Sequence, residues 1–239
     1  MMTELTLPII GYMHSSYKEK FGIPRQPNLV QVESYIEMSA PYNDVLAFEG
    51  IEAFSHLWLV WQFHDNKNPE KTQFRPQVRP PRLGGNKKIG VFATRSMYRP
   101  SPIGLSVVKL KCVKKEGKSV RVYVTGSDLL DGTPIVDIKP YIHYSDAVID
   151  AESGYAQDEP NRKSVIWSDR AIEQKQQLLT SGKLSVQTAQ ELEAVLSLDP
   201  RPAYQDDEAR VYKMKFAAVD IAFTVGETTV NITDVELET

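Results

Sequence analysis

The sequence predicts a mainly β protein in which a small α+β domain follows a larger β domain. Short runs of β-branched and aromatic residues recur between prolines and glycines from about residue 5 to residue 145. Helical periodicity is scarce in that region and becomes clear only in the last third of the chain. No Gly-x-Gly-x-x-Gly turn follows a first strand, so a doubly wound parallel sheet has no support.

Strands of the larger domain, residues 1–146, are expected at residues 9–13, 29–36, 55–63, 89–94, 104–113, 119–125 and 134–138. The hairpin formed by 104–113 and 119–125 is the clearest of these. Apolar residues alternate along both of its strands, at Val108, Leu110 and Cys112 and then at Val120, Val122 and Val124. Short strands at this spacing predict a barrel or a sandwich.

A change of composition at residues 147–163 predicts a linker, because acids, Ser153-Gly154 and Pro160 replace the strand pattern there. The small domain is then expected to span residues 164–239. It begins with helices at 169–180 and 185–198, the second with Ser185 as its N-cap, and it ends with strands at 211–217, 219–225 and 229–235.

Composition favours an ordinary globular protein of the cytoplasm. The chain of 239 residues is 25% charged and 41% apolar, and Cys112 is its only cysteine, so an intramolecular disulfide and a cysteine-based zinc cluster are excluded. The N-terminus carries an acid where a secretory signal would carry bases. The longest apolar run, around residues 57–61, is far shorter than the roughly 20 residues that cross a bilayer, so no membrane insertion is expected.

The net charge of −3 hides a strong local asymmetry. Twelve basic residues and no acidic residue lie between Lys71 and Lys115, whereas the rest of the chain has 16 basic and 31 acidic residues. Such a segment would attract a phosphate-rich ligand, with Arg82, Lys87, Lys88 and Arg99 as candidate RNA contacts. The alternative is a solvated, lysine-rich loop.

Motifs for nucleophilic or metal-dependent catalysis are missing. The four histidines lie far apart in the sequence, there is no Gly-x-Ser-x-Gly turn, and Cys112 lies in the middle of a strand, so no metal site is expected. Two segments are richer in unusual residues than structure demands: 17–27, a proline-stiffened loop with Arg25 and Gln26, and 90–106, a proline-clamped turn with Arg95 and Arg99.

Six segments of the chain closely resemble the TsaA-like family, which is also called the TrmO family. They are residues 17–27, 50–58, 79–86, 90–106, 127–141 and the Asp-Pro-Arg-Pro-Ala-Tyr segment 199–204. The chain departs from the family signature at Ser101, where that signature has an asparagine, so an asparagine-specific contact is not expected there.

This resemblance implies a β-barrel methyltransferase domain with a small C-terminal α+β domain, acting as a homodimer. It implies transfer of a methyl group from S-adenosylmethionine to the exocyclic nitrogen of threonylcarbamoyladenosine, next to the anticodon of a transfer RNA. The residues implied to bind the donor are Arg25, Gln26, Pro27, Phe63, His64, Arg95, Leu105, Asp128, Leu129, Leu130, Asp131 and Gly132.

The two other functions that the residues allow are a non-catalytic RNA-binding module and a metal-dependent hydrolase built from converging histidines. In the segment 199–204, Pro200 is explained as the residue that ends the preceding helix, and Pro202 as a residue that stiffens the chain after it. Arg201 and Tyr204 have no such structural explanation. They are therefore predicted to contact RNA, the arginine at a phosphate and the tyrosine by stacking, over a barrel that is complete without them.

Overall fold

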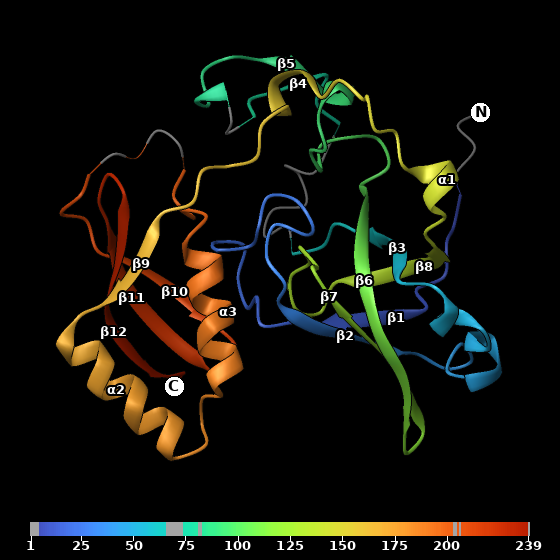
Figure 1. Ribbon diagram of the computed structural model, residues 1–239. Helices are drawn as coiled ribbons and strands as arrows, with labels where there is room; N and C mark the ends of the chain where they lie inside the picture. The colour runs from blue at the N-terminus through green and yellow to red at the C-terminus, as the bar shows by residue number, and fades with distance from the viewer. Residues whose placement is uncertain (1–4, 66–73, 81–82, 203–204, 206, 239) are drawn as a thin grey trace.

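The computed structural model describes residues 5–65, 74–80, 83–202, 205 and 207–238, which form a β-barrel and a second unit of sheet and helices (Figure 1). The barrel is closed by antiparallel pairing in the order β1-β2-β7-β6-β3-β8. This confirms the barrel and removes the sandwich alternative. The strands are β1 Gly11–His14, β2 Glu33–Met38, β3 His56–Gln62, β6 Ile103–Glu116, β7 Ser119–Thr125 and β8 Pro134–Pro140.

Alternation along each strand gives the barrel its core. Every second residue points inward, so the interior is filled by side chains. The buried cluster comprises Met13, Ile36, Met38, Leu57, Leu59, Val108, Leu110, Val120, Val122, Val124, Leu129 and Ile135.

A bulge in β6 corrects one detail of the predicted hairpin. The pairing register shifts between Leu110 and Cys112, so that Cys112 lies opposite the outward-facing Tyr123. Val113 then takes the inward position opposite Val122. Cys112 is therefore not on the core face, although simple alternation predicts it there.

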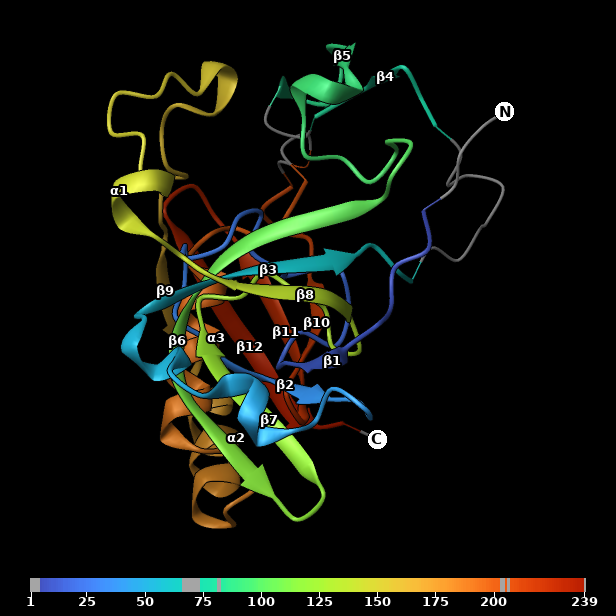
Figure 2. The same cartoon turned by 90° about the vertical axis from the view of Figure 1, so that its right-hand side faces the viewer.

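One predicted strand is also much shorter than expected. The strand predicted at 89–94 ends after two residues, as β5 Ile89–Gly90, which pairs with β4 Gln77–Val78. A 3-10 turn, Val91–Ala93, follows because Thr94 closes back on the Val91 carbonyl. Both views place this β4–β5 ribbon above the barrel (Figures 1 and 2).

The second unit is a four-stranded sheet with two helices packed against it. Its order is β10-β11-β12-β9, and β9 runs parallel to β12. The predicted helices and the last three strands are confirmed, whereas β9 and the short helix α1 His143–Asp146 are not predicted by the sequence. The elements are β9 Ser164–Trp167, α2 Asp169–Thr180, α3 Val186–Leu196, β10 Tyr212–Phe216, β11 Val219–Val225 and β12 Thr229–Leu237.

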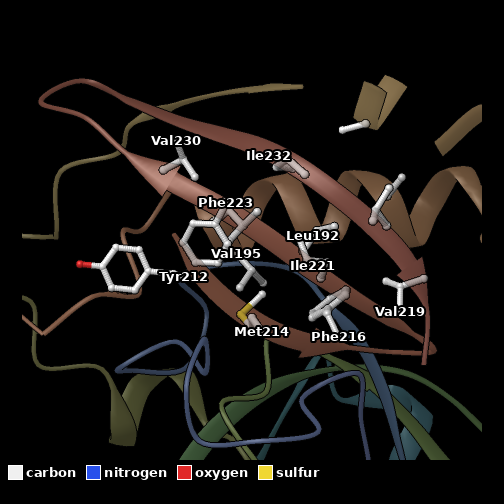
Figure 3. Close-up of a cluster of buried hydrophobic side chains, with 14 of the residues drawn as sticks. Leu192, Val195, Tyr212, Met214, Phe216, Val219, Ile221, Phe223, Val230 and Ile232 are labelled. Carbon is white, nitrogen blue, oxygen red and sulfur yellow. The ribbon is translucent and has the colours of Figure 1, made fainter. Parts of the chain in front are cut away.

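The core of this second unit also takes in residues from the connection between β1 and β2. Leu192 and Val195 of α3 pack on Phe223 and its neighbours in the sheet (Figure 3). Tyr17, Val30 and Val32 are buried in the same cluster, although they precede β2 in the chain. This is why β2 begins at Glu33, later than the strand predicted at 29–36.

Backbone contacts also join the β1–β2 connection to the second unit. Tyr17 forms an isolated bridge with Phe216, and the Ala217 amide donates to the Ser16 carbonyl. The chain itself passes between the units at residues 147–163, across the top of Figure 1. The two units are thus joined by packing as well as by a linker.

Within the described residues, no helix combines the length and the apolar character that a membrane span requires.

Candidate functional site

One mouth of the barrel gathers most of the residues that the resemblance points to. β3 ends there and β6 and β8 begin there, since Gln62 pairs with Ile103 and Trp61 with Ile135. Three connections meet at this mouth: residues 15–32, 91–102 and 126–133. The Asp131 amide donates to the Tyr17 carbonyl, which ties the first of them to the third.

Asp128, in the 126–133 connection, is an ionisable group of this mouth. Its Oδ1 accepts a hydrogen bond of 2.6 Å from the Ser106 hydroxyl, and Ser106 accepts one of 3.0 Å from the indole nitrogen of Trp61. Burial raises the pKa of Asp128 to about 6, while the Ser106 bond and the charge of Arg95 act in the opposite direction. Asp128 is thus a carboxylate held in an environment that opposes its charge.

Arginines from two connections lie at the rim of the mouth. The Arg95 guanidinium donates to the side-chain oxygen of Gln26, and Pro27 follows in the same loop. Arg25 donates 3.0 Å to the carbonyl oxygen of Arg201 in the second unit. The loop with Arg25 and Gln26 is therefore held from both sides.

Phe63 and His64 follow β3 at the same mouth. The Phe63 ring meets the Trp61 ring edge-on at 4.5 Å, and its amide donates to the Pro102 carbonyl. Burial lowers the pKa of His64 below its ordinary value, which favours the neutral imidazole. A Cβ on Gly132, where φ is +77°, would lie 4.0 Å from the His64 ring.

Four of the predicted donor residues have other surroundings. Leu129 is 1% exposed and belongs to the barrel core, and Leu105 is 53% exposed, on the face of β6 opposite to Ser106. Asp131 accepts from the Ser15 amide and from the Lys18 ammonium, both at 2.9 Å. Leu130 presents a carbonyl that accepts from Thr133. The side chain of Leu129 is therefore part of the barrel core, and that of Asp131 is engaged by Ser15 and Lys18.

The basic candidates divide into two groups. Lys87 and Lys88 are exposed beside β5. Arg99, in contrast, donates from its guanidinium to the backbone carbonyls of Ser96, Val91 and Thr94, so it closes the turn that carries Arg95. The structure describes neither Arg82 nor Tyr204.

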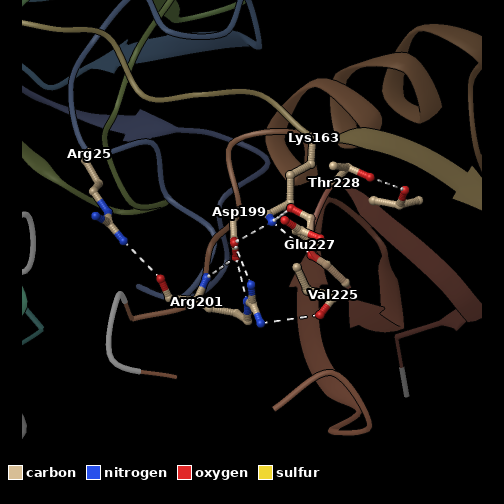
Figure 4. Close-up of polar contacts among 9 residues, drawn as sticks. Arg25, Lys163, Asp199, Arg201, Val225, Glu227 and Thr228 are labelled. Carbon is tan, nitrogen blue, oxygen red and sulfur yellow. Dashed lines mark hydrogen bonds and ion pairs between the residues drawn. The ribbon is translucent and has the colours of Figure 1, made fainter. Parts of the chain in front are cut away.

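Arg201 is buried, which argues against the predicted contact between its guanidinium and an RNA phosphate. Its side chain is 7% exposed, and it donates twice to Asp199, at 2.9 Å from both Nε and Nη2 (Figure 4). A third donor reaches the Val225 carbonyl. The guanidinium is therefore bonded within the second unit, as a buried charge must be, because leaving it unpaired would be costly. The backbone carbonyl of Arg201, which accepts from Arg25, is the group that contacts the barrel.

Sequence reasoning missed Trp61 and Ser106. A signal for Ser106 was present, because it occupies an inward position of a strand whose other inward positions are apolar. Nothing in the sequence pairs Ser106 with Asp128, since 22 residues separate them.

No three His, Cys, Asp or Glu residues of the described chain lie close enough together to hold a metal ion. The hydrolase alternative therefore has no candidate site within that part of the protein.

Comparison with known proteins covers nearly the whole chain. Residues 12–147 match the family model of the tRNA-methyltransferase O N-terminal domain, and residues 160–238 match that of the TrmO C-terminal domain. A tRNA (adenine(37)-N6)-methyltransferase of Escherichia coli is 45% identical over 208 residues, which is 87% of this chain and 86% of that protein. A putative S-adenosylmethionine-dependent methyltransferase of Pseudomonas aeruginosa is 44% identical over 223 residues, 92% of each. The crystal structure of TrmO from P. aeruginosa superimposes with a TM-score of 0.78 at 35% identity, covering 100% of this chain and 99% of that one.

Proposed function

This chain belongs to the tRNA-methyltransferase O family and is an S-adenosylmethionine-dependent tRNA (adenine-N6)-methyltransferase, and we propose that its acceptor is threonylcarbamoyladenosine next to the anticodon. The relative from E. coli is named for position 37, the nucleotide that follows the anticodon. We further propose that the enzyme works in the cytoplasm as a homodimer.

The Asp128 carboxylate, held by Ser106 at the barrel mouth and near enough to Arg95 to feel its charge, is the observation that supports the donor site. S-adenosylmethionine has an ammonium group, ribose hydroxyls and a carboxylate, so its pocket needs a hydrogen-bond acceptor of negative charge and a cation. Asp128 supplies the first and Arg95 the second, and both lie close enough for the charge of one to affect the other. The residues present therefore fit the donor.

Aromatic and backbone groups complete the proposed pocket. Phe63, packed on Trp61, offers a flat apolar wall for the adenine ring. The 128–132 turn offers backbone groups, and Gly132 leaves room beside His64. Arg25, Gln26 and Pro27 form the rim, and Arg95 anchors that rim through Gln26.

The donor supplies a methyl group already activated on a positively charged sulfur. The protein then has to hold the acceptor nitrogen in line with that group and exclude water, tasks that need neither a nucleophilic side chain nor a metal. The barrel mouth suits this role because its side chains are fixed by hydrogen bonds before any ligand enters.

The exposed Lys87 and Lys88 support an RNA path beside the β4–β5 ribbon. Arg82 and Tyr204 remain candidates on their sequence alone. For Arg99 and Arg201 we propose an indirect part: Arg99 shapes the Arg95 turn, and Arg201 holds the loop of Arg25.

The test is methyl transfer to two preparations of the same transfer RNA, one with the threonylcarbamoyl group and one without. We expect labelled methyl groups to enter only the first, and nucleoside mass spectrometry should find them on the modified adenosine. Equal labelling of both preparations would contradict the proposed acceptor. Labelling of neither preparation would also contradict the proposed acceptor.

A further inference from the structure

A chain of two hydrogen bonds leads from the barrel wall to the carboxylate of Asp128. Trp61 of β3 donates to Ser106 of β6, and Ser106 donates to Asp128 in the β7–β8 connection. The three residues come from three separate elements, and Ser106 is 1% exposed. No role at the donor site is assigned to Trp61 or Ser106 by the family resemblance.

The direction of this chain is fixed by chemistry. An indole N–H is a donor only, so the Ser106 oxygen has to accept from Trp61. The single hydroxyl hydrogen of Ser106 is then directed at Oδ1 of Asp128, which therefore acts as acceptor. A bond of 2.6 Å in this direction stabilises the ionised carboxylate, because charge-assisted O–H···O⁻ bonds are short and strong.

The backbone makes room for the arrangement at Gly104. A Cβ at this position would lie 2.2 Å from Cε2 and Cζ2 of Trp61, so any larger residue would displace the indole. Gly104 pairs directly with Trp61 across β3 and β6. The missing side chain lets the indole nitrogen reach Ser106 two residues further along.

Among the described residues, Arg95 and Tyr17 are ionisable groups that interact electrostatically with Asp128. Arg95, from the turn after β5, favours the charged carboxylate. Tyr17, from the β1–β2 connection, is buried and its pKa is raised by burial and then by Asp128, so it stays neutral. Its hydroxyl has no hydrogen-bond partner within the described residues. Arg95 is therefore the only one of these two groups that offsets burial.

We propose that Trp61 and Ser106 are positioning residues that keep Asp128 ionised and oriented to receive the ammonium or ribose hydroxyls of S-adenosylmethionine. This inference rests on the donor site proposed above. Arg95 lies at an exposed rim, where solvent screens its charge. The buried Ser106 hydroxyl therefore provides the more persistent stabilisation of the Asp128 carboxylate. Removing the hydroxyl would leave a buried carboxylate that takes up a proton near neutral pH.

The first experiment measures Asp128 itself, in the full-length protein without donor. The carboxyl signal of labelled aspartate is followed by NMR against pH in the parent, in Ser106→Ala and in Trp61→Phe. Ser106→Ala is expected to weaken proton dissociation from Asp128 about tenfold, the scale of one lost bond to a charged group. Trp61→Phe should act in the same direction with a smaller effect, because it frees the Ser106 hydroxyl to turn.

The matched control is Ser34→Ala, which removes a hydroxyl that is equally buried in the barrel and has no hydrogen-bond partner within the described residues. It should leave the titration of Asp128 unchanged. An unchanged titration in Ser106→Ala, with the fold intact by circular dichroism, would overturn the proposal. So would an equal shift in Ser34→Ala.

The second experiment measures donor affinity by calorimetry at pH 6 and pH 8.5. Ser106→Ala should bind the donor several-fold more weakly at pH 6 and closer to the parent at pH 8.5, where Asp128 is ionised in both. In an Asp128→Asn background the same substitution should have no further effect, since a positioning residue acts through the group it positions. An effect of equal size in both backgrounds would contradict the proposal. If the titration shifts as expected but Asp128→Asn binds the donor like the parent, the donor site itself is misplaced.

Discussion

The Asp128 carboxyl group lies where burial opposes its negative charge, so its ionisation affects the stability of the fold. The native protein binds the Asp128 proton more tightly than the unfolded chain does, because the pKa is raised from 3.8 to about 6. The contribution of Asp128 to stability is therefore most favourable below about pH 4, and this contribution is lost as the pH rises to about 6. Above pH 6 the ionised carboxylate lowers the free energy of unfolding by up to about 3 kcal/mol.

Asp128→Asn is accordingly expected to stabilise the fold at pH 8 and to have little effect near pH 4, because the amide carries no charge and still accepts from Ser106. Thermal unfolding followed at both pH values checks this. A variant that is less stable than the parent at pH 8 would show that the charge is better compensated than its surroundings suggest.

Arg95→Ala should weaken the binding of S-adenosylmethionine by about 1.5–3 kcal/mol, the range for a lost hydrogen bond to a charged group. The side chain is exposed and its described hydrogen bond goes to Gln26, so the fold should be unaffected. Calorimetry on the folded variant gives the answer, with Lys109→Ala on the outer face of β6 as the control. Unchanged donor affinity would remove Arg95 from the site.

Secondary-structure elements were predicted well where one pattern controlled them. The β6–β7 hairpin, α2, α3 and the last three strands follow directly from alternation, periodicity and caps. Prediction failed where a distant partner decides the conformation. Residues 29–32 look like a strand but leave the barrel because Val30 and Val32 are buried in the second core. Residues 91–93 turn because Thr94 and the Arg99 guanidinium both donate to the Val91 carbonyl.

The Asp199–Arg201 pair belongs to this scale as well, since it joins the end of α3 to β11. Burial opposes the charge of Asp199, but the Arg201 guanidinium holds its pKa below the ordinary value. Arg201→Ala would remove both guanidinium hydrogen bonds from that half-buried carboxylate and leave it only the Lys163 ammonium, 3.7 Å away, so we expect a loss of about 2–3 kcal/mol in unfolding free energy. Arg201→Lys should recover only part of it, because an ammonium cannot make both bonds. Urea unfolding of the two variants measures the difference, and stability equal to the parent would contradict this role.

The sequence predicted side chains that gather at the barrel mouth, but not the hydrogen bonds that hold them there. The resemblance supplied Gln26, Arg95 and Asp128, and the structure brings these to one barrel mouth. It did not supply the Trp61–Ser106 support, because only the closed barrel brings β3, β6 and the β7–β8 connection together.

At the scale of the whole molecule, charge is unevenly distributed, and the acid-free segment should dominate RNA affinity. Replacing both Lys87 and Lys88 with glutamine is expected to flatten the salt dependence of transfer RNA binding by about one to two units of slope. Donor affinity should not change. Filter binding across a range of salt concentrations measures the slope, and an identical slope would mean that the RNA follows another path.

Packing between the two units leads to a further expectation, which differs from the sequence-based view of a self-sufficient barrel. Residues 1–146 alone would expose Tyr17, Val30 and Val32 and would lose the carbonyl that holds Arg25. We expect this fragment to be poorly folded or to bind the donor much more weakly than the full chain. Parent-like donor affinity in a monomeric, folded fragment would show that the second unit is dispensable for the donor site.

The shared core also sets an order of events during synthesis. Tyr17, Val30 and Val32 leave the ribosome early, but the strands that bury them, β10 to β12, follow only about 180 residues later. At roughly 5–20 residues per second this interval lasts on the order of 10–40 s. Throughout it, the nascent barrel carries an uncovered apolar segment beside its own donor loop, which chaperones or a neighbouring nascent chain can reach. The connection between β1 and β2 can thus complete its packing only after β10 to β12 have been translated.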